Sequence, residues 1–155
     1  MGGVPHHPPA PAAQHTVDLL ERNDLQLATG RIHHGDWSEA WGRRAAEAVL
    51  RTDPDTDAFF CGNDQIARGV ADTLRENGMD VPGRIAIVGY DTWDVMPLTC
   101  RPPLTTIRQD FPALADRAVA ALVAEIEGGA DAAAEAPATS VVPTSLVVRS
   151  STTAR

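Results

Sequence analysis

The feature that most limits how this chain can fold is the alternation of short apolar runs with amphipathic segments between residues 36 and 127. The runs Asp57–Gly62 and Ile85–Gly89 have the length of strands, and Leu104–Arg108 is a third short candidate. Ile85–Gly89 is apolar throughout, which is typical of a parallel strand covered on both faces. The alternation therefore predicts an α/β fold with an open, mostly parallel sheet and helices on both faces.

Two amphipathic segments lie on either side of the first of these strands. Asp36 to Thr52 carries apolar residues at helical spacing, and Asp36 precedes Glu39 by three residues, as in a capping box. In the second segment Asn63 is placed as an N-cap, and Gly78 suits the left-handed position just after a helix. Both segments are predicted to be helices. The first begins at Asp36 and ends at Thr52, and the second begins after Asn63 and ends before Gly78.

The beginning and the end of the chain have weaker patterns than its middle. Residues 1–34 are interpreted as a linker and an irregular opening segment because prolines crowd its first half. A weak helix over Thr16–Arg22 and a strand within Leu25–His34 are predicted there. Residues 35–150 form the predicted folded lobe, and residues 151–155 a frayed tail.

The last third of the folded lobe is predicted to hold one long helix and one strand. The helix spans Phe111–Glu127, with Asp110 as its N-cap, and the Ala- and Gly-rich residues Gly128–Pro137 are predicted to be a loop. A strand within Val141–Arg149 is interrupted by Pro143, which favours an edge or crossover position in the sheet.

Composition argues against several classes of protein. The chain has 13 basic and 21 acidic residues and a net charge of −8, so on its own it repels the phosphate backbone of nucleic acids. Two cysteines, Cys61 and Cys100, are too few for a disulfide framework and are expected to be buried free thiols. The alternative is a single disulfide between them. No run is apolar enough to span a membrane, and the first residues lack the features of a secretory signal. The predicted location is the cytoplasm.

Motifs of hydrolytic or metal chemistry are not found. The sequence has no GxSxG elbow, no HExxH pair and no Walker loop. The pairs His6-His7 and His33-His34 match no standard metal spacing and are expected to be surface residues. Cys61 has no evident basic partner to activate it. We therefore expect no enzyme activity, no metal and no cofactor.

Polar residues follow two of the predicted strands, and they form the candidate site. Asn63 comes after Asp57–Gly62, and Asp91 after Ile85–Gly89. Ligands of open α/β sheets bind beyond the carboxyl ends of the strands, so these two side chains are expected in one crevice. A carboxylate there accepts sugar hydroxyls, and an amide donates and accepts. The alternative is that Asn63 only caps its helix and Asp91 only starts a turn.

An aromatic residue, Trp37, lies on the same expected rim. Its flat ring is suited to stack on the apolar face of a pyranose. The alternative is that Trp37 is a core or staple residue at the start of a helix. Trp41, four residues later on the apolar stripe, is predicted to be core.

Six motifs occur in a fixed order between residues 35 and 152: GDWS (35–38), CGNDQIARG (61–69), GMDVP (78–82), IAIVGYD (85–91), RPPLTTIRQDF (101–111) and SLVVRSST (145–152). Together they resemble the effector-binding domain of the lactose/galactose repressor (LacI–GalR) family, whose type I fold is shared with periplasmic sugar-binding proteins. The branch with a tryptophan shortly after the glycine–aromatic–aspartate turn, here Trp93, is the most similar. Each motif is modest alone, but six in the right order are specific.

The resemblance implies roles for individual residues of this chain. Asp91 would hold sugar hydroxyls, Asn63 would hydrogen-bond the same ligand, and Trp37 would pack on its ring. Gln109 and Phe111 would border the cleft, where the family's chain crosses between subdomains. Two further residues, Trp93 and Asp64, would lie at the pocket or at a dimer surface.

The resemblance also implies the function and its limits. The chain would be the sugar-binding lobe of a LacI-type transcription regulator that is a homodimer at full length and contacts DNA only through a headpiece absent here. Family members are considerably longer, so the chain looks truncated. The family's usual arginine before GDWS has no clear counterpart, and the helix from Phe111 would expose the stripe that normally packs on the first lobe. The alternatives are a fragment of a transport-type periplasmic binding protein and a partner-dependent half-domain with no ligand.

Overall fold

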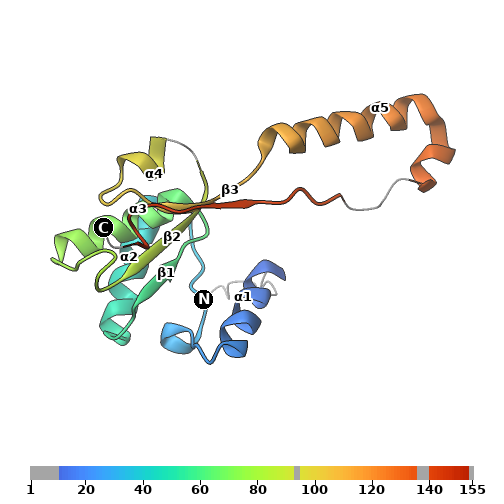
Figure 1. Cartoon of the computed structure of the whole chain (residues 1–155). Coiled ribbons are helices and arrows are strands. Elements are labelled where there is room, and N and C mark those ends of the chain that lie inside the picture. The colour runs from blue at the N-terminus through green and yellow to red at the C-terminus, as the bar shows by residue number, and fades with distance from the viewer. Residues whose placement is uncertain (1–10, 93–94, 136–139, 154–155) are drawn as a thin grey trace, which may run out of the picture.

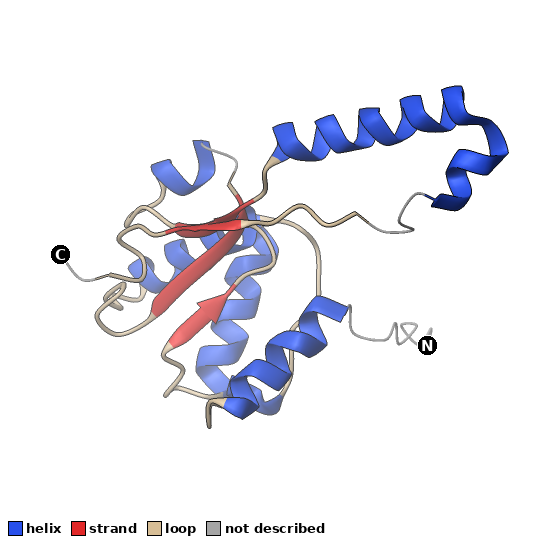
Figure 2. Ribbon diagram, turned by 45° about the vertical axis from the view of Figure 1, so that its right-hand side comes forward, coloured by secondary structure: helices blue, strands red, loops and turns tan. Residues whose placement is uncertain are grey.

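The computed structural model describes residues 11–92, 95–135 and 140–153 (Figures 1 and 2). In chain order its elements are α1 (Pro11–Arg22), the 3-10 turn η1 (Ala28–Gly30), α2 (Glu39–Thr52), β1 (Ala58–Phe60), α3 (Asp64–Glu76), β2 (Ala86–Asp91), α4 (Val95–Thr99), β3 (Thr105–Arg108), α5 (Phe111–Glu135) and β4 (Ser145–Val147). The four strands form one sheet in the order β1-β2-β3-β4. The first three are parallel, and β4 is antiparallel to β3 at the edge. The predicted open, mostly parallel α/β fold is confirmed.

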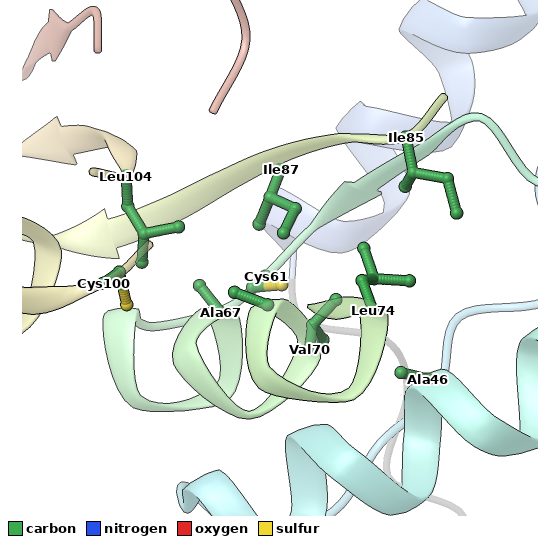
Figure 3. Close-up of a cluster of buried hydrophobic side chains, with 10 residues drawn as sticks. Ala46, Cys61, Ala67, Val70, Leu74, Ile85, Ile87, Cys100 and Leu104 are labelled. Carbon is green, nitrogen blue, oxygen red and sulfur yellow. The ribbon is translucent and has the colours of Figure 1, made fainter. Parts of the chain in front are cut away.

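The hydrophobic core lies between the sheet and α3 (Figure 3). Ile85 and Ile87 point from the middle of the sheet toward Val70 and Leu74 of α3, and all four are buried. Helix α2 packs on the outer side of α3, and α1 lies on the opposite side of the sheet (Figures 1 and 3). Most of the fully buried apolar side chains thus lie on one side of the sheet, in the layer between the sheet and helices α2 and α3.

Helices α2 and α3 approach each other closely at two glycines. A Cβ atom on Gly42 of α2 would collide with the carbonyl oxygen of Ile66, and one on Gly69 of α3 would collide with that of Glu39. These residues lie where the two helices cross, so any side chain at either glycine would push the backbones apart. Together with the sheet, α2 and α3 form a tightly packed unit, which we call the body.

Helix α5 extends away from the body (Figures 1 and 2). We call α5 and the returning residues 140–144 the arm. Arg117 donates to the Ser140 hydroxyl at 3.1 Å and to the Val141 carbonyl at 2.9 Å, which ties the two segments of the arm together. The exposed apolar side chains of α5 are Phe111, Leu114, Val119, Leu122, Val123 and Ile126. The predicted exposure of this stripe is confirmed.

The structure corrects the prediction for the first part of the chain. No strand forms within Leu25–His34, because that segment contains η1 and its backbone turns left-handed at Thr29 (φ 60°) and Gly30 (φ 67°). The weak helix is longer than predicted, since α1 begins at Pro11. A proline in the first helical turn loses no hydrogen bond, so the proline-rich sequence permits this start.

Two helix boundaries and one whole helix also differ from the prediction. Helix α2 is capped by Ser38, whose hydroxyl accepts from the Trp41 amide at 3.1 Å, and not by Asp36. Helix α5 continues to Glu135, because the alanines beyond residue 129 favour helix more strongly than two glycines oppose it. Helix α4 was not predicted at all. Within the described residues, every helix is too short or too polar to cross a bilayer.

Candidate functional site

The polar residues that follow β1 and β2 meet at one edge of the sheet. These strands are parallel neighbours, so their carboxyl ends open on the same side. A cavity of about 380 Å³ lies there, and its lining includes residues from both strand ends, from the loop before α2 and from the start of α5. The lining residues are Trp37, Asn63, Asp64, Gln65, Asp91, Met96 and Phe111. The structure therefore brings together Asn63, Asp91 and Trp37, as the sequence predicted.

Asn63 has two structural duties. Its side chain is the N-cap of α3, because Oδ1 accepts from the Ile66 amide at 2.8 Å. The residue is only 4% exposed and still lines the cavity. The predicted capping role is confirmed. Asn63 also lines the cavity, so capping is not its only role. Since Oδ1 is engaged, Nδ2 is the group that the side chain can offer to a ligand.

Asp91 ends β2 with a strained backbone. Its φ is 98° and that of Thr92 is 53°, a region that residues other than glycine rarely adopt. The Asp91 carboxylate accepts a hydrogen bond from Gln109 Nε2 at 2.8 Å. Gln109 lies between β3 and α5, so the predicted border residue acts on the cavity through Asp91. Asp91 thus combines a strained backbone with a carboxylate that is oriented at the cavity wall. The alternative that Asp91 only starts a turn does not account for this arrangement.

Two aromatic side chains stand at the rim of the cavity. Trp37 is 71% exposed, and Phe111 is also exposed. The core or staple interpretation of Trp37 is therefore wrong. Trp41 is partly buried, with its ring over Gly35 and the Arg44 guanidinium 5.8 Å from the ring centroid. Trp41 takes the packing position, which leaves the ring of Trp37 for the cavity.

Asp64 is buried beneath the cavity. The residue is 2% exposed, and its Oδ1 accepts from the Thr106 hydroxyl at 2.6 Å. Gly89 of β2 makes room for this carboxylate, because a Cβ there would collide with Oδ1. Asp64 is therefore placed in the lining of the pocket, and its position relative to a dimer surface stays a prediction. Trp93 lies outside the described residues.

Three residues of the site were missed by the sequence analysis. Gln65 lines the cavity from the first turn of α3, and its place directly after Asn63 and Asp64 was a usable signal. Met96 lines the cavity from α4, and its role could not be read because that helix had no clear pattern. Thr106 is completely buried in β3, where only the tertiary structure shows its contact with Asp64.

Neither Cys61 nor Cys100 is among the residues that line the cavity, and neither thiol is ionised at neutral pH. Burial, followed by the charge of Asp64, raises the pKa of Cys61 to about 12, and burial raises that of Cys100 to about 11. Both thiols are therefore protonated at neutral pH and poor nucleophiles. Among the described residues, no group of three or more His, Cys, Asp or Glu side chains could hold a metal ion. The cavity itself is lined by two carboxylates, two amides, two aromatic rings and Met96.

Comparison with known sequences gives one consistent result. The model of the family described as "Periplasmic binding protein-like domain" matches residues 7–152. The lactose operon repressor of Klebsiella pneumoniae is 35% identical over 130 residues, which are 83% of this chain and 35% of the relative. The repressor CytR of Escherichia coli K12 is 30% identical over 112 residues, 72% of this chain and 33% of the relative. The chain thus spans about a third of the length of these curated relatives.

Solved structures agree with the sequence comparison. The transcriptional regulator CelR in complex with cellobiose matches 89% of this chain and 41% of its own, with a TM-score of 0.77 and 27% identity. A Lac repressor dimer bound to operator and the anti-inducer ONPF matches 88% of this chain and 39% of its own, with a TM-score of 0.75 and 33% identity. Both comparisons cover nearly the whole chain and less than half of the regulator.

Proposed function

Because this chain belongs to the periplasmic binding protein-like family, as the effector-binding part of a LacI–GalR-type transcription regulator, we propose that its cavity binds a small carbohydrate effector. The observation that carries the proposal is the meeting of Asn63, Asp91 and Trp37 in one cavity of about 380 Å³. This volume lies within the range of roughly 300–1,000 Å³ of small-molecule sites. Hydrogen-bonding groups beside aromatic rings are the chemistry that recognises a sugar.

Each residue has a defined task in this proposal. Asp91 Oδ2 accepts sugar hydroxyls, while Gln109 holds Oδ1 and fixes the orientation of the carboxylate. Asn63 donates from Nδ2, because its Oδ1 caps α3. Trp37 and Phe111 cover the apolar faces of the ring from the rim of the cavity. The buried Asp64 supports the floor through Thr106.

The similar proteins suggest how such a lobe works in a whole regulator. One solved relative is a complex with cellobiose, and another is a dimer bound to operator. We assign DNA binding to another part of the regulator, since this chain has a net charge of −8 and repels phosphates. The lobe would sense its effector in the cytoplasm without catalysis, within a homodimer, and pass the change to the DNA-binding part.

Titration calorimetry of the chain against a panel of mono- and disaccharides tests the site. We expect sugars to bind only weakly to the isolated chain, and Asp91→Ala to abolish the binding heat of any sugar that does bind, because the main hydroxyl acceptor is lost. The matched control is Asp55→Ala, an exposed aspartate in the turn that leads into the opposite end of β1. Binding that Asp91→Ala leaves unchanged would contradict the site assignment.

The exposed arm supports a second candidate, a half-domain that acts only through a partner. Its apolar side chains on α5 remain uncovered in the single chain. In this case the purified chain would bind no sugar and would associate when concentrated. Size-exclusion chromatography with amide exchange separates the two candidates, because a folded monomer with a protected body supports the sensor. Transport-type binding proteins are not favoured, since the similar proteins reported above are regulators.

A further inference from the structure

The charged groups in the wall of the cavity are of one sign. Asp64 and Asp91 are carboxylates, Asn63 and Gln65 are neutral amides, and the remaining lining residues are apolar or aromatic. Of the described residues that line the cavity, none is basic. We infer that the cavity selects an uncharged sugar and rejects the phosphorylated form of the same sugar. This inference rests on the proposed function and names the class of its effector.

The N-terminus of α3 does not offset this negative charge. A helix N-terminus attracts anions through its free amide groups. Here the side chain of Asn63 already accepts from the Ile66 amide, and Asp64 places its own carboxylate in the first turn. The feature of the cavity most suited to a phosphate is therefore occupied by the chain itself.

The two carboxylates are also held in place. Asp64 is buried and accepts from Thr106, and it lies directly over Gly89. Asp91 is held by Gln109. Neither group can swing away from an approaching anion without losing a hydrogen bond. Their repulsion of a phosphate is screened less by water than the repulsion between charges on an open surface.

One basic residue, Arg108, lies beside Asp91 in the sheet. Its Cα is the register partner of Asp91 in β3, but its side chain is exposed and is not among the lining residues. Arg108 is therefore not part of the cavity wall that a bound phosphate would face. We expect Arg108→Gln to leave the affinity ratio between a neutral sugar and its phosphate nearly unchanged.

Calorimetry on the full chain with matched pairs of ligands tests the inference. The probes are glucose with glucose 6-phosphate and cellobiose with cellobiose 6-phosphate. We expect a neutral sugar to bind at least about tenfold more tightly than its phosphate, a difference that narrows at high salt. Equal or tighter binding of a phosphate overturns the inference but leaves the proposed function standing. Absence of binding by every neutral sugar of the mono- and disaccharide panel contradicts the proposed function and the inference with it.

A charge-removing variant shows whether Asp64 causes the selectivity. Asp64→Asn keeps the shape of the side chain and an oxygen that can accept from Thr106. We expect it to narrow the ratio between the neutral sugar and its phosphate, while Asp55→Asn leaves the ratio unchanged. An unchanged ratio in a folded Asp64→Asn chain overturns the electrostatic cause. If this variant does not fold, the salt dependence of the ratio in the unaltered chain decides in its place.

Discussion

The body and the arm are both largely helical, but different forces hold their helices. In the body, Leu74 of α3 is 0% exposed and packs between the sheet and α2. In the arm, Leu122 of α5 is 60% exposed and has no such neighbours. Isolated helices are marginal in water, so α3 depends on tertiary packing, whereas α5 depends on its alanine-rich sequence. The comparison teaches that the folding free energy of this chain resides in the body.

Cysteine labelling should give the largest contrast between the two regions. The pKa of about 12 for Cys61, against 9.0 for an ordinary thiol, lowers its thiolate fraction at pH 8 about a thousandfold. We expect iodoacetamide to label neither native cysteine in the folded chain and to label both in urea. A Val123→Cys variant in the arm should react at once. Fast labelling of Cys61 would show that the body opens.

The same thiols make the body sensitive to alkali. Their raised pKa values mean that the folded state holds the protons longer than the unfolded state does. The free energy of unfolding is thus highest below pH 9 and falls as the pH rises toward 11 and 12. The chain has no lysine to obscure the effect. A Cys61→Ala/Cys100→Ala chain should lose most of this dependence in urea unfolding curves recorded across the range.

Truncating one leucine in each region measures the contrast in free energy. Leu74→Ala leaves a cavity in the core and should lower the free energy of unfolding by about 2–5 kcal/mol. Leu122→Ala should change it by no more than about 0.5 kcal/mol, since an exposed side chain loses little. Urea denaturation followed by circular dichroism gives both values. Similar losses in the two variants would show that the arm packs against the body in solution.

A methyl group at the helix crossing should have the next largest effect. Gly69→Ala would raise helix propensity by roughly 0.5–1 kcal/mol, but its Cβ collides with the Glu39 carbonyl. We expect a net loss of about 1–3 kcal/mol, as in other overpacked sites. Gly62→Ala is the control, because a Cβ there meets no atom within 4 Å. A stabilised Gly69→Ala chain would mean that α2 and α3 cross less closely.

Exposed ion pairs and hydrogen bonds should contribute least to the free energy of unfolding in both regions. In the body Arg43 contacts Glu76 at 2.8 Å and Asp72 at 3.2 Å, and this arginine lowers the pKa of Glu76. Arg43→Ala should destabilise the chain only slightly, with an effect that vanishes at high salt or as the pH falls and Glu76 is protonated. In the arm, Arg117→Ala should leave urea unfolding unchanged but speed amide exchange near Ser140. If either variant lowered the free energy of unfolding as much as Leu74→Ala does, polar contacts would not be the smallest contribution.

The parts of the fold that the sequence predicted are those with strong local patterns. The apolar run Ile85–Gly89, the N-cap Asn63 and the left-handed Gly78 were all identified, because each is a local chemical requirement. The strand proposed within Leu25–His34 failed, since a weakly patterned segment is decided by its surroundings. Helix α4 was missed for the same reason. The end of α5 was misplaced because glycines were given more weight than the alanines that follow them.

The site was predictable to the extent that the order of the strands fixes it. Asn63 and Asp91 could be paired because parallel neighbouring strands end on one edge of a sheet. The contact between Thr106 and Asp64, and the exposure of Trp37 in place of Trp41, depend on packing across three elements. Such contacts join residues far apart in the chain, so no local pattern records them.

The left-handed backbone at Asp91 implies a conflict between robustness and recognition. Glycine adopts that conformation without strain, so Asp91→Gly would relieve the end of β2 while removing the acceptor for the ligand. Laboratory evolution for heat resistance alone should therefore discard the carboxylate early, whereas selection that also rewards sensing should retain it.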